Sequence, residues 1–286
     1  MSWSPEDPTL RRAGIVKNPD VDPEYASRLV AVLEKHDVEV VGSAEVSYDT
    51  HDTEDTHDTE DTHDTESPVD GAADVIFVLG GDGTMLRASK THPGKVLLGV
   101  NLGTVGFMSG MSPENIEPGV EQVLEGALHV QEYRLLEIES GGERRLAVND
   151  AVLLKKRPHQ IASVEVSVGG ERLASYQCDG LIAATPLGST AYALSAGGPI
   201  ISGDVPCYTL VPIAPHSLVS RPMVLGGEQR TELTLNTRGA LLSLDGGEPY
   251  ELEPGSTVRV GLSEESIKIG RTDEWSWWRA VRRTFL

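Results

Sequence analysis

The sequence has few of several residue types, and each shortage excludes a class of protein. Only 2 of its 286 residues are cysteines, Cys178 and Cys207, and their number and spacing fit neither a disulfide framework nor a zinc motif. No apolar run approaches the roughly 18 residues of a membrane span. The first ten residues lack the basic start and apolar stretch of a signal peptide. We therefore expect a cytoplasmic protein that makes no contact with membranes.

Positive charge is also scarce. The chain has 24 Lys and Arg residues against 44 Asp and Glu residues, which gives a formal net charge of −20. A surface of this sign repels nucleic acids and anionic membranes, so neither is expected as a partner. Because carboxylates keep a protein hydrated when salt screens its charges, the composition indicates a halophilic origin.

The N-terminal part of the chain alternates between strand and helix patterns. Short apolar runs at residues 12–20, 38–41, 73–79 and 96–100 predict strands, and apolar residues at helical spacing over residues 22–36 predict a helix. A further helix is expected from about Met85. This rhythm is typical of a Rossmann-like parallel sheet. It predicts an α/β nucleotide-binding domain over residues 1–110.

Short alternating segments separated by Gly and Pro turns dominate after residue 111. They predict a mostly-β, β-sandwich-like domain over residues 111–271. Residues 272–286 predict a closing helix that packs back on the first domain, with its tryptophans as packing anchors.

One segment of the first domain stands apart. Residues 49–66 repeat DTHDTE three times without a change. Three histidines at a period of six permit a metal site, but the tract has no apolar residue with which to offset the entropy of ordering. We interpret it as a disordered acidic surface insertion.

The first segment with chemical character is GGDGT, residues 80–84, which follows a buried strand and precedes a helix. Open α/β sheets bind ligands at this edge. Glycines let the backbone approach phosphate oxygens, and a helix start presents free N–H groups to them. One carboxylate among small residues suits a base, or a group facing a hydroxyl or Mg²⁺. A sharp turn with Asp82 as a capping residue is the structural alternative.

Three further segments carry polar groups. Asn101, Gly103, Gly106 and Phe107 belong to a strand-to-glycine turn, in which Phe107 suits either an adenine face or the core. The pair Asn149-Asp150 suits a purine edge and a ribose diol. The run at residues 179–200, DGLIAATPLGSTAYALSAGGPI, concentrates small and hydroxyl residues that let a backbone pass close to a polar ligand.

Four segments, in this order along the chain, resemble the motifs of the NAD kinase family. They are GGDGT, NxGxxGF, the Asn-acid pair and DG…TPxGSTAYxxSAGGP. Residues 215–222 and Asp245-Gly246 are similar to that family's later blocks. The resemblance extends from about residue 74 to residue 250. GGDGT is shared with diacylglycerol, sphingosine and 6-phosphofructo-type kinases, whereas the GSTAY run is much more specific.

The resemblance implies a two-domain kinase that holds NAD between its domains and assembles as a homodimer or homotetramer. It implies that Asp82 takes the proton of the adenosine 2′-hydroxyl, with ATP or polyphosphate and Mg²⁺ supplying the phosphoryl group. Phe107 and Asn149 would lie on the adenine side and Asp150 at a ribose diol. The residues implied to contact NAD are Gly83, Phe107, Asn149, Asp150, Asp179, Thr190, Ala191, Tyr192, Ser195 and Asp245. The residues expected along the donor's phosphates are Gly80, Gly81, Thr84 and Arg87, and no protein ligand is assigned to the metal.

The sequence departs from the family's pattern at two positions. Asp150 stands where the family usually has Glu, which shortens the reach to the diol. Leu187 stands where the family has Thr, so the hydrogen bond of that hydroxyl is lost.

Two other functions stay open. A lipid or sugar kinase could share the GGDGT turn, although it would not need the GSTAY run. A non-catalytic NAD-binding sensor could keep the pocket, although the intact Asp82 argues against it.

Deletion of residues 49–66 should leave catalysis largely intact, because a tract without apolar residues contributes no packing. The measurement is the specific activity of the deletion variant beside the full chain, with circular dichroism as the control for folding. Loss of activity in a folded deletion variant would contradict this interpretation.

Overall fold

The structure is a computed structural model that describes residues 10–46, 69, 72–103, 106–217, 219–236, 238–273 and 275–286. The DTHDTE tract and its histidines lie outside these residues. The chain divides into two units, Met1–Glu132 with Ile267–Leu286 as unit 1, and Tyr133–Ser266 as unit 2. None of the helices in the described part of the chain is long and apolar enough to cross a membrane.

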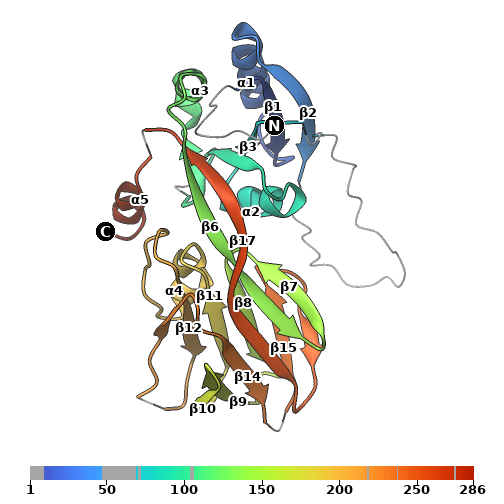
Figure 1. Cartoon of the computed structure of the whole chain (residues 1–286), viewed down its shortest axis with the longest axis vertical. Helices are drawn as coiled ribbons and strands as arrows, with labels where there is room; N and C mark the ends of the chain where they lie inside the picture. Colours follow the sequence, from blue (N-terminus) through green and yellow to red (C-terminus); the bar gives the residue numbers. More distant parts are fainter. Residues whose placement is uncertain are drawn as a thin grey trace, which may run out of the picture. The chain divides into compact units, whose positions relative to one another are not determined.

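Unit 1 is built around a parallel sheet (Figure 1). Its strand order is β2-β1-β3-β4-β17, with β5 beside β4, and every pairing within it is parallel. Its strands are β1 (Arg12–Lys17), β2 (Glu39–Glu45), β3 (Val75–Leu79), β4 (Val96–Val100), β5 (Ser109–Met111) and the last residues of β17 (Thr257–Arg271). Its helices are α1 (Pro23–Lys35), α2 (Asp82–Thr91), α3 (Ile116–Leu124), α5 (Trp277–Phe285) and the short 3₁₀ helix η1 (Pro113–Asn115).

Helices cover both faces of this sheet. All residues of β3 and β4 are buried, as the continuous apolar runs predict for parallel strands. Leu29 of α1 and Val120 of α3 pack in one core with Phe77 and Leu98. Met85 of α2 lies against Gly99. Because the neighbours of Gly99 in β4, Leu98 and Val100, face that core, α2 covers the opposite face of the sheet. The expected α/β domain with a parallel sheet is confirmed.

Unit 2 consists of antiparallel strands. One sheet contains β9, β10, β14 and the first part of β17, with β6 and β7, and the other has the order β13-β12-β11-β8-β15-β16. The strands are β6 (His129–Ser140), β7 (Glu143–Ala147), β8 (Asp150–Lys155), β9 (Ala162–Val168), β10 (Glu171–Cys178), β11 (Gly180–Ala184), β12 (Cys207–Ile213), β13 (Met223–Gly226), β14 (Thr231–Leu235), β15 (Ala240–Leu244) and β16 (Tyr250–Leu252). Two short helices, η2 (Gly188–Thr190) and α4 (Tyr192–Ser195), follow β11.

The core of unit 2 lies between its two sheets. Val166 and Leu233 of one sheet pack in a single cluster with Leu181 and Leu210 of the other. Ala193 of α4 packs with Val152, Ile182 and Val211, residues that alternate with the inward-facing ones. The mostly-β second domain is therefore confirmed.

The sequence-based domain limits, 1–110 with 272–286 and 111–271, differ from the limits of the two units. Residues 111–132 belong to unit 1 because α3 contributes Ile116, Val120 and Val123 to the core of the parallel sheet. The strands β6 and β17 each run from one unit into the other, so neither limit coincides with a loop.

The closing helix expected near the C-terminus is α5. Trp277 is buried with Phe107, and Trp275 is half-buried beside it, as expected of packing anchors. Trp278 is not an anchor, because 71% of it is exposed.

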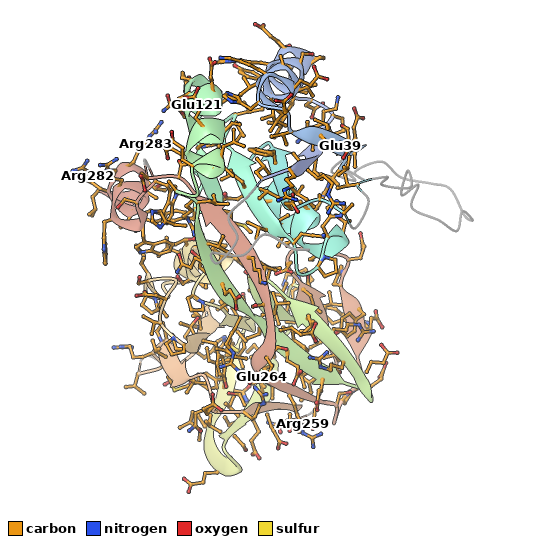
Figure 2. The ribbon with its side chains drawn as sticks, turned by 45° about the horizontal axis from the view of Figure 1, so that its top comes forward. Glu39, Glu121, Arg259, Glu264, Arg282 and Arg283 are labelled. Carbon is orange, nitrogen blue, oxygen red and sulfur yellow. The ribbon has the colours of Figure 1, made fainter. Side chains whose placement is uncertain are left out.

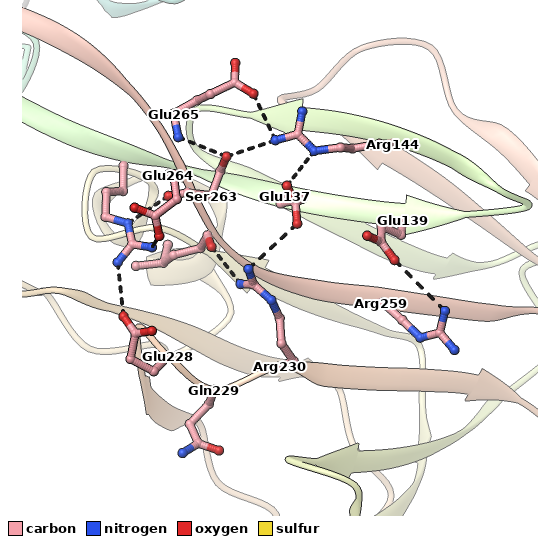
Figure 3. Close-up of polar contacts among 12 residues, drawn as sticks. Glu137, Glu139, Arg144, Glu228, Gln229, Arg230, Arg259, Ser263, Glu264 and Glu265 are labelled. Atoms are coloured by element: carbon pink, nitrogen blue, oxygen red, sulfur yellow. Dashed lines mark hydrogen bonds and ion pairs between the residues drawn. The ribbon is translucent and has the colours of Figure 1, made fainter.

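Arginines of unit 2 gather acidic side chains into one network (Figure 3). Arg144 pairs with Glu137 at 2.5 Å and with Glu265 at 2.9 Å. Arg230 reaches Glu137 at 3.7 Å and donates to the Leu262 carbonyl at 2.6 Å. The hydrogen bonds that Arg144 donates to the Glu137 and Glu265 carboxylates raise the pKa of Arg144. The network joins β6, β7 and β17 with the residue that precedes β14.

Both cysteines are free and buried in unit 2. Burial raises the pKa of the Cys178 thiol to about 11. It therefore stays protonated and unreactive at neutral pH.

The buried hydroxyl pair of unit 2 provides a stability test. The Tyr208 hydroxyl lies 2.6 Å from the Thr231 hydroxyl, and both residues are fully buried. Tyr208→Phe should lower the free energy of unfolding by about 1–3 kcal/mol, because Thr231 then loses its partner. Adding Thr231→Val should recover part of that loss, because both polar groups are then gone. Denaturant titrations of both variants check this, and equal stability of Tyr208→Phe and the unsubstituted protein would contradict it.

Candidate functional site

The first half of the candidate site lies where β3 meets α2 in unit 1. The helix begins at Asp82, three residues before the expected start, with Gly81 at its N-cap. Gly80 has a φ of 156°, and a Cβ there would lie 2.3 Å from Thr84 Oγ1, so only glycine fits. The glycines of the motif therefore place Asp82 in the first turn of the helix, among its free N–H groups.

Two backbone hydrogen bonds hold the half-buried Asp82 carboxylate. The N–H of Phe107 donates to Oδ2 at 2.8 Å, and the N–H of Met108 donates to Oδ1 at 3.0 Å. A Cβ at Gly106 would lie 2.1 Å from Oδ1. The structure thus brings together the GGDGT and NxGxxGF segments, as their positions after neighbouring strands predict.

A buried arginine holds the same turn from its carbonyl side. Arg271, at the end of β17, is 4% exposed. Its Nη2 donates to the Phe107 carbonyl at 2.8 Å and its Nη1 donates to Gln131 Oε1 at 3.1 Å. Its guanidinium lies 3.6 Å from the centre of the Trp275 ring. Sequence reasoning missed Arg271, because no local pattern marks an arginine that acts on a turn far away in the chain.

Phe107 belongs to the core beneath α5. It is 5% exposed, with its ring centre 5.2 Å from that of Trp277 and 5.6 Å from that of Phe285, on which it is stacked. The sequence allows Phe107 to face either an adenine or the core, and in the structure its ring packs in the core. An adenine contact would require Phe285 to leave the ring.

In unit 2, Asp245 organises the turn that carries Asn149 and Asp150. Its Oδ1 accepts from the N–H groups of Asn149 at 2.7 Å and Asp150 at 3.2 Å, and its Oδ2 accepts from the N–H of Val148 at 2.9 Å. Asp245 itself adopts a left-handed conformation with φ 52°. Asn149 is half-buried and Asp150 is only 5% exposed.

The GSTAY run separates into a buried scaffold and an exposed surface. The Thr185 hydroxyl donates to the Val148 carbonyl at 2.7 Å and accepts from the Gly188 N–H at 3.1 Å. The Ser189 hydroxyl donates to the Pro186 carbonyl at 2.6 Å and accepts from the Ile201 N–H at 3.0 Å. The Ser189 hydroxyl is thus committed to the loop's own backbone, and the Thr185 hydroxyl ties the loop to the backbone of the Asn149 turn.

The remaining residues of the run face outward. Ala191, Tyr192 and Ser195 are exposed on or beside α4, and Tyr192 is 44% exposed. Thr190 is half-buried, and its hydroxyl donates to the Leu187 carbonyl at 3.1 Å. These exposed side chains are the ones that a ligand can reach.

Gly188 and Leu187 explain the shape of the GSTAY run. A Cβ at Gly188 would lie 2.1 Å from the Asn149 carbonyl oxygen, so the run passes directly against the Asn149 turn. Leu187 is 2% exposed. The side chain that replaces the family's threonine is therefore inside the fold.

The last two site residues predicted from the sequence, Asp179 and Arg87, are charged. Asp179 forms a salt bridge of 2.6 Å with Lys155, a partner that the sequence did not indicate. Arg87 is half-buried on α2, one turn beyond Asp82 and Gly83. Within each unit the predicted residues thus come together: Gly80, Gly81, Asp82, Gly83, Thr84 and Phe107 in unit 1, and Asn149, Asp150 and Asp245 with the GSTAY run in unit 2.

Comparison with known proteins supports one family. Residues 13–128 match the ATP-NAD kinase N-terminal domain, and residues 148–272 match the ATP-NAD kinase C-terminal domain. Over 283 residues the chain is 33% identical to the NAD kinase of Methanothermobacter thermautotrophicus, covering 97% of each chain.

Solved structures show the same fold. A yeast NADH kinase complexed with NADH superposes with a TM-score of 0.80 at 23% identity, covering 96% of this chain and 87% of that one. An NAD kinase from Archaeoglobus fulgidus in complex with ATP superposes with a TM-score of 0.73 at 26% identity, covering 95% and 99%.

The fold and these residues define a phosphotransferase with an α/β domain that carries a GGDGT turn and a second, mostly antiparallel β domain. Both domain matches together span most of the chain. The chain belongs to the NAD kinase family.

Gly106→Ala should reduce kinase activity by about 100-fold or more, because the new methyl group displaces the Asp82 carboxylate. Gly226→Ala is the control, since a Cβ there also meets no atom within 4 Å and Gly226 lies in unit 2, outside the residues assigned to the site. Activity of both purified variants with NAD and ATP checks the prediction. Equal activities would show that the contact between Gly106 and Asp82 does not control the site.

Proposed function

We propose that this protein transfers the γ-phosphoryl group of a nucleotide to the 2′-hydroxyl of the adenosine ribose of NAD, giving NADP. The observation that carries the proposal is the Asp82 carboxylate, fixed by the Phe107 and Met108 N–H groups in the first turn of α2. Phosphoryl transfer needs positioning and charge stabilisation more than covalent chemistry from the protein. A fixed carboxylate beside free N–H groups supplies both.

Asp82 acts as the general base. Each carboxylate oxygen has two lone pairs, and each accepts one backbone hydrogen bond, so acceptor capacity remains for a substrate hydroxyl. Gly106, which lacks a side chain, leaves the carboxylate room. The carboxylate takes the hydroxyl proton as the oxygen attacks phosphorus.

The N-terminus of α2 holds phosphate oxygens. Gly81 and Gly83 place backbone N–H groups at the positive end of the helix dipole, and Arg87 adds a guanidinium on the same helix. The N–H groups of Gly80 and Thr84 donate to the carbonyls of Val100 and Gly81, so these two residues shape the turn along which the phosphates lie. ATP serves as a donor, a role consistent with the ATP complex of the Archaeoglobus fulgidus relative. Inorganic polyphosphate carries the same phosphoanhydride chemistry.

The residues fit a magnesium ion that arrives with the nucleotide. Across the described ranges no group of three His, Cys, Asp or Glu residues is placed to hold a metal. Mg²⁺ usually keeps several waters and binds substrate phosphates, and we assign it no protein ligand here. When bound, the ion neutralises charge on the phosphates.

Unit 2 supplies the side chains that recognise NAD. Asn149 and Asp150 present an amide and a carboxylate in a turn fixed by Asp245, which suits an adenine edge and a ribose diol. The exposed NAD-binding side chains are Tyr192 and Ser195, with Thr190 and Ala191 in the same run. Asp179, which the family resemblance also assigns to NAD, precedes β11 and so lies at the opposite end of that strand from this run. Asp245 contributes by fixing this turn.

The remaining parts of the proposal follow from composition and from the family resemblance. The protein works in the cytoplasm as a homodimer or homotetramer and tolerates high salt, where its net charge of −20 is screened. Light scattering at low and molar KCl measures the subunit number.

Asp82→Asn should lower kcat by about 100- to 10,000-fold with little change in the affinity for NAD, because the amide cannot accept the proton. Asp74→Asn is the matched control, since the Asp74 carboxylate also accepts two backbone N–H groups, of Arg11 and Arg12, and lies outside the site. The measurements are NADP formation with NAD, ATP and Mg²⁺, and NAD binding by calorimetry.

The position of the new phosphate in the product tests whether the 2′-hydroxyl is the acceptor. Phosphorus NMR of the product should show a 2′-ester. A kcat for Asp82→Asn within tenfold of that of the unsubstituted enzyme would remove the base from the mechanism. Tight NAD binding without any product would indicate a sensor.

A further inference from the structure

Unit 1 contains a cleft that the NAD-binding residues leave unexplained. Its volume is about 760 Å³, within the usual range for sites that bind a cofactor-sized ligand. One wall contains residues 101–103, 106 and 109–114, and the other contains residues of α5 with Trp275 and Ser276. All of the lining residues belong to unit 1.

The cleft has the opposite charge to the rest of the chain. Arg279, Arg282 and Arg283 line it from α5, at positions that share one helix face, while Glu114 is the one acidic residue among the described residues of the lining. Among the described residues neither Arg282 nor Arg283 forms a salt bridge, and Figure 2 shows both on α5. In a chain with almost twice as many acids as bases, two arginines without acidic partners at one cleft indicate an anionic ligand.

Polar atoms in the walls also lack partners. The Ser109 hydroxyl and the indole N–H of Trp275 are buried, and neither has a hydrogen-bond partner among the described residues. Both residues line the cleft, and Ser109 is only 3% exposed. Buried polar groups of this kind are normally satisfied, so an oxygen-rich ligand is the missing partner. Gly103, where a Cβ would meet no atom within 4 Å, leaves part of the wall's backbone open to that ligand.

One end of the cleft reaches the proposed base. Gly106 lines the cleft, and a Cβ on it would lie 2.1 Å from Asp82 Oδ1 and 3.1 Å from Ser109 Oγ. Asp82 itself is not among the lining residues, so the cleft extends from Gly106, the neighbour of the Asp82 carboxylate, to the arginines of α5. A chain of phosphates bound along it would have one end beside the base.

We propose that this cleft binds the phosphate chain of the phosphoryl donor, with Arg282 and Arg283 as its principal cationic contacts. The proposal rests on the proposed function and identifies where its second substrate binds. Arginine suits this role because its planar guanidinium pairs with phosphate oxygens through two parallel hydrogen bonds. Nucleoside triphosphates and inorganic polyphosphate share this chemistry, and either could occupy the cleft.

The first test is binding of inorganic tripolyphosphate, measured by calorimetry. The unsubstituted protein should bind it, and Arg282→Gln/Arg283→Gln should bind it about tenfold more weakly or worse, because two charge-assisted contacts are lost. The control is Arg157→Gln/Arg238→Gln, which removes the same charge from exposed positions of unit 2 and should keep the affinity within twofold. Arg282 and Arg283 are both exposed, so their replacement leaves the buried residues of α5, Trp277, Ala280 and Val281, in place.

The second test is kinetic. Arg282→Gln/Arg283→Gln should raise the KM for the donor about tenfold or more, while NAD binding is unchanged. Running ATP and polyphosphate in separate assays shows which donor uses the cleft, since only that donor's KM should rise.

The outcomes separate the two proposals. Tripolyphosphate binding that depends on Arg282 and Arg283, in a protein that forms no NADP, would support the cleft and overturn the proposed function. NADP formation with unchanged tripolyphosphate affinity and unchanged donor KM in the double variant would overturn the cleft alone. An equal loss of affinity in the Arg157/Arg238 control would also overturn it, because the effect would then be one of net charge.

Discussion

The pair of hydrogen bonds between the Asp82 carboxylate and the N–H groups of Phe107 and Met108 is the constraint on which the catalytic part of the structure depends. It joins the turn after β3 to the turn after β4. Because parallel neighbouring strands end at the same sheet edge, a side chain as short as aspartate can span the two turns. The contact is possible only with glycine at position 106. Arg271 holds the Phe107 carbonyl, so the turn is fixed through its N–H groups and through its carbonyl.

Unit 2 uses the same device for a different purpose. Asp245 accepts three backbone N–H groups and so fixes the turn that presents Asn149 and Asp150. Thr185 and Gly188 pack the GSTAY run against the same turn. In both units a carboxylate orders a turn, and the ordered turn presents the groups that we assign to substrate. Such preorganisation matters for phosphoryl transfer, where alignment of reactants supplies much of the rate.

The distribution of arginines reconciles an acidic protein with anionic substrates. Arg144 and Arg230 are occupied by glutamates within unit 2, and Arg271 is buried beneath the Asp82 turn. Arg282 and Arg283 line the cleft of unit 1 without acidic partners among the described residues. A net charge of −20 therefore coexists with a local concentration of positive charge where phosphates are expected.

The sequence by itself determined the two kinds of domain and the location of the chemical segments. The uniformly apolar sequences of β3 and β4 predict parallel strands that are buried on both faces. The alternating segments predict the antiparallel unit, because a strand buried on one face needs an apolar residue only at every second position. The GGDGT and GSTAY motifs indicated the family before any contact was known. Only the start of α2 was placed three residues late, because the pattern of apolar residues does not report that Gly81 serves as the N-cap.

Tertiary structure decided which of these residues act on one another. Phe107 could equally have faced a ligand or the core, and α5 decided this by covering its ring with Trp277 and Phe285. Thr185 and Ser189 look like ligand contacts in the sequence, yet their hydroxyls bind backbone carbonyls, that of Val148 for Thr185 and that of Pro186 for Ser189. Arg271 and the cleft beside α5 carry no local signal at all. Each depends on segments more than 100 residues apart, and such contacts follow from packing in three dimensions, which the local pattern of a sequence does not encode.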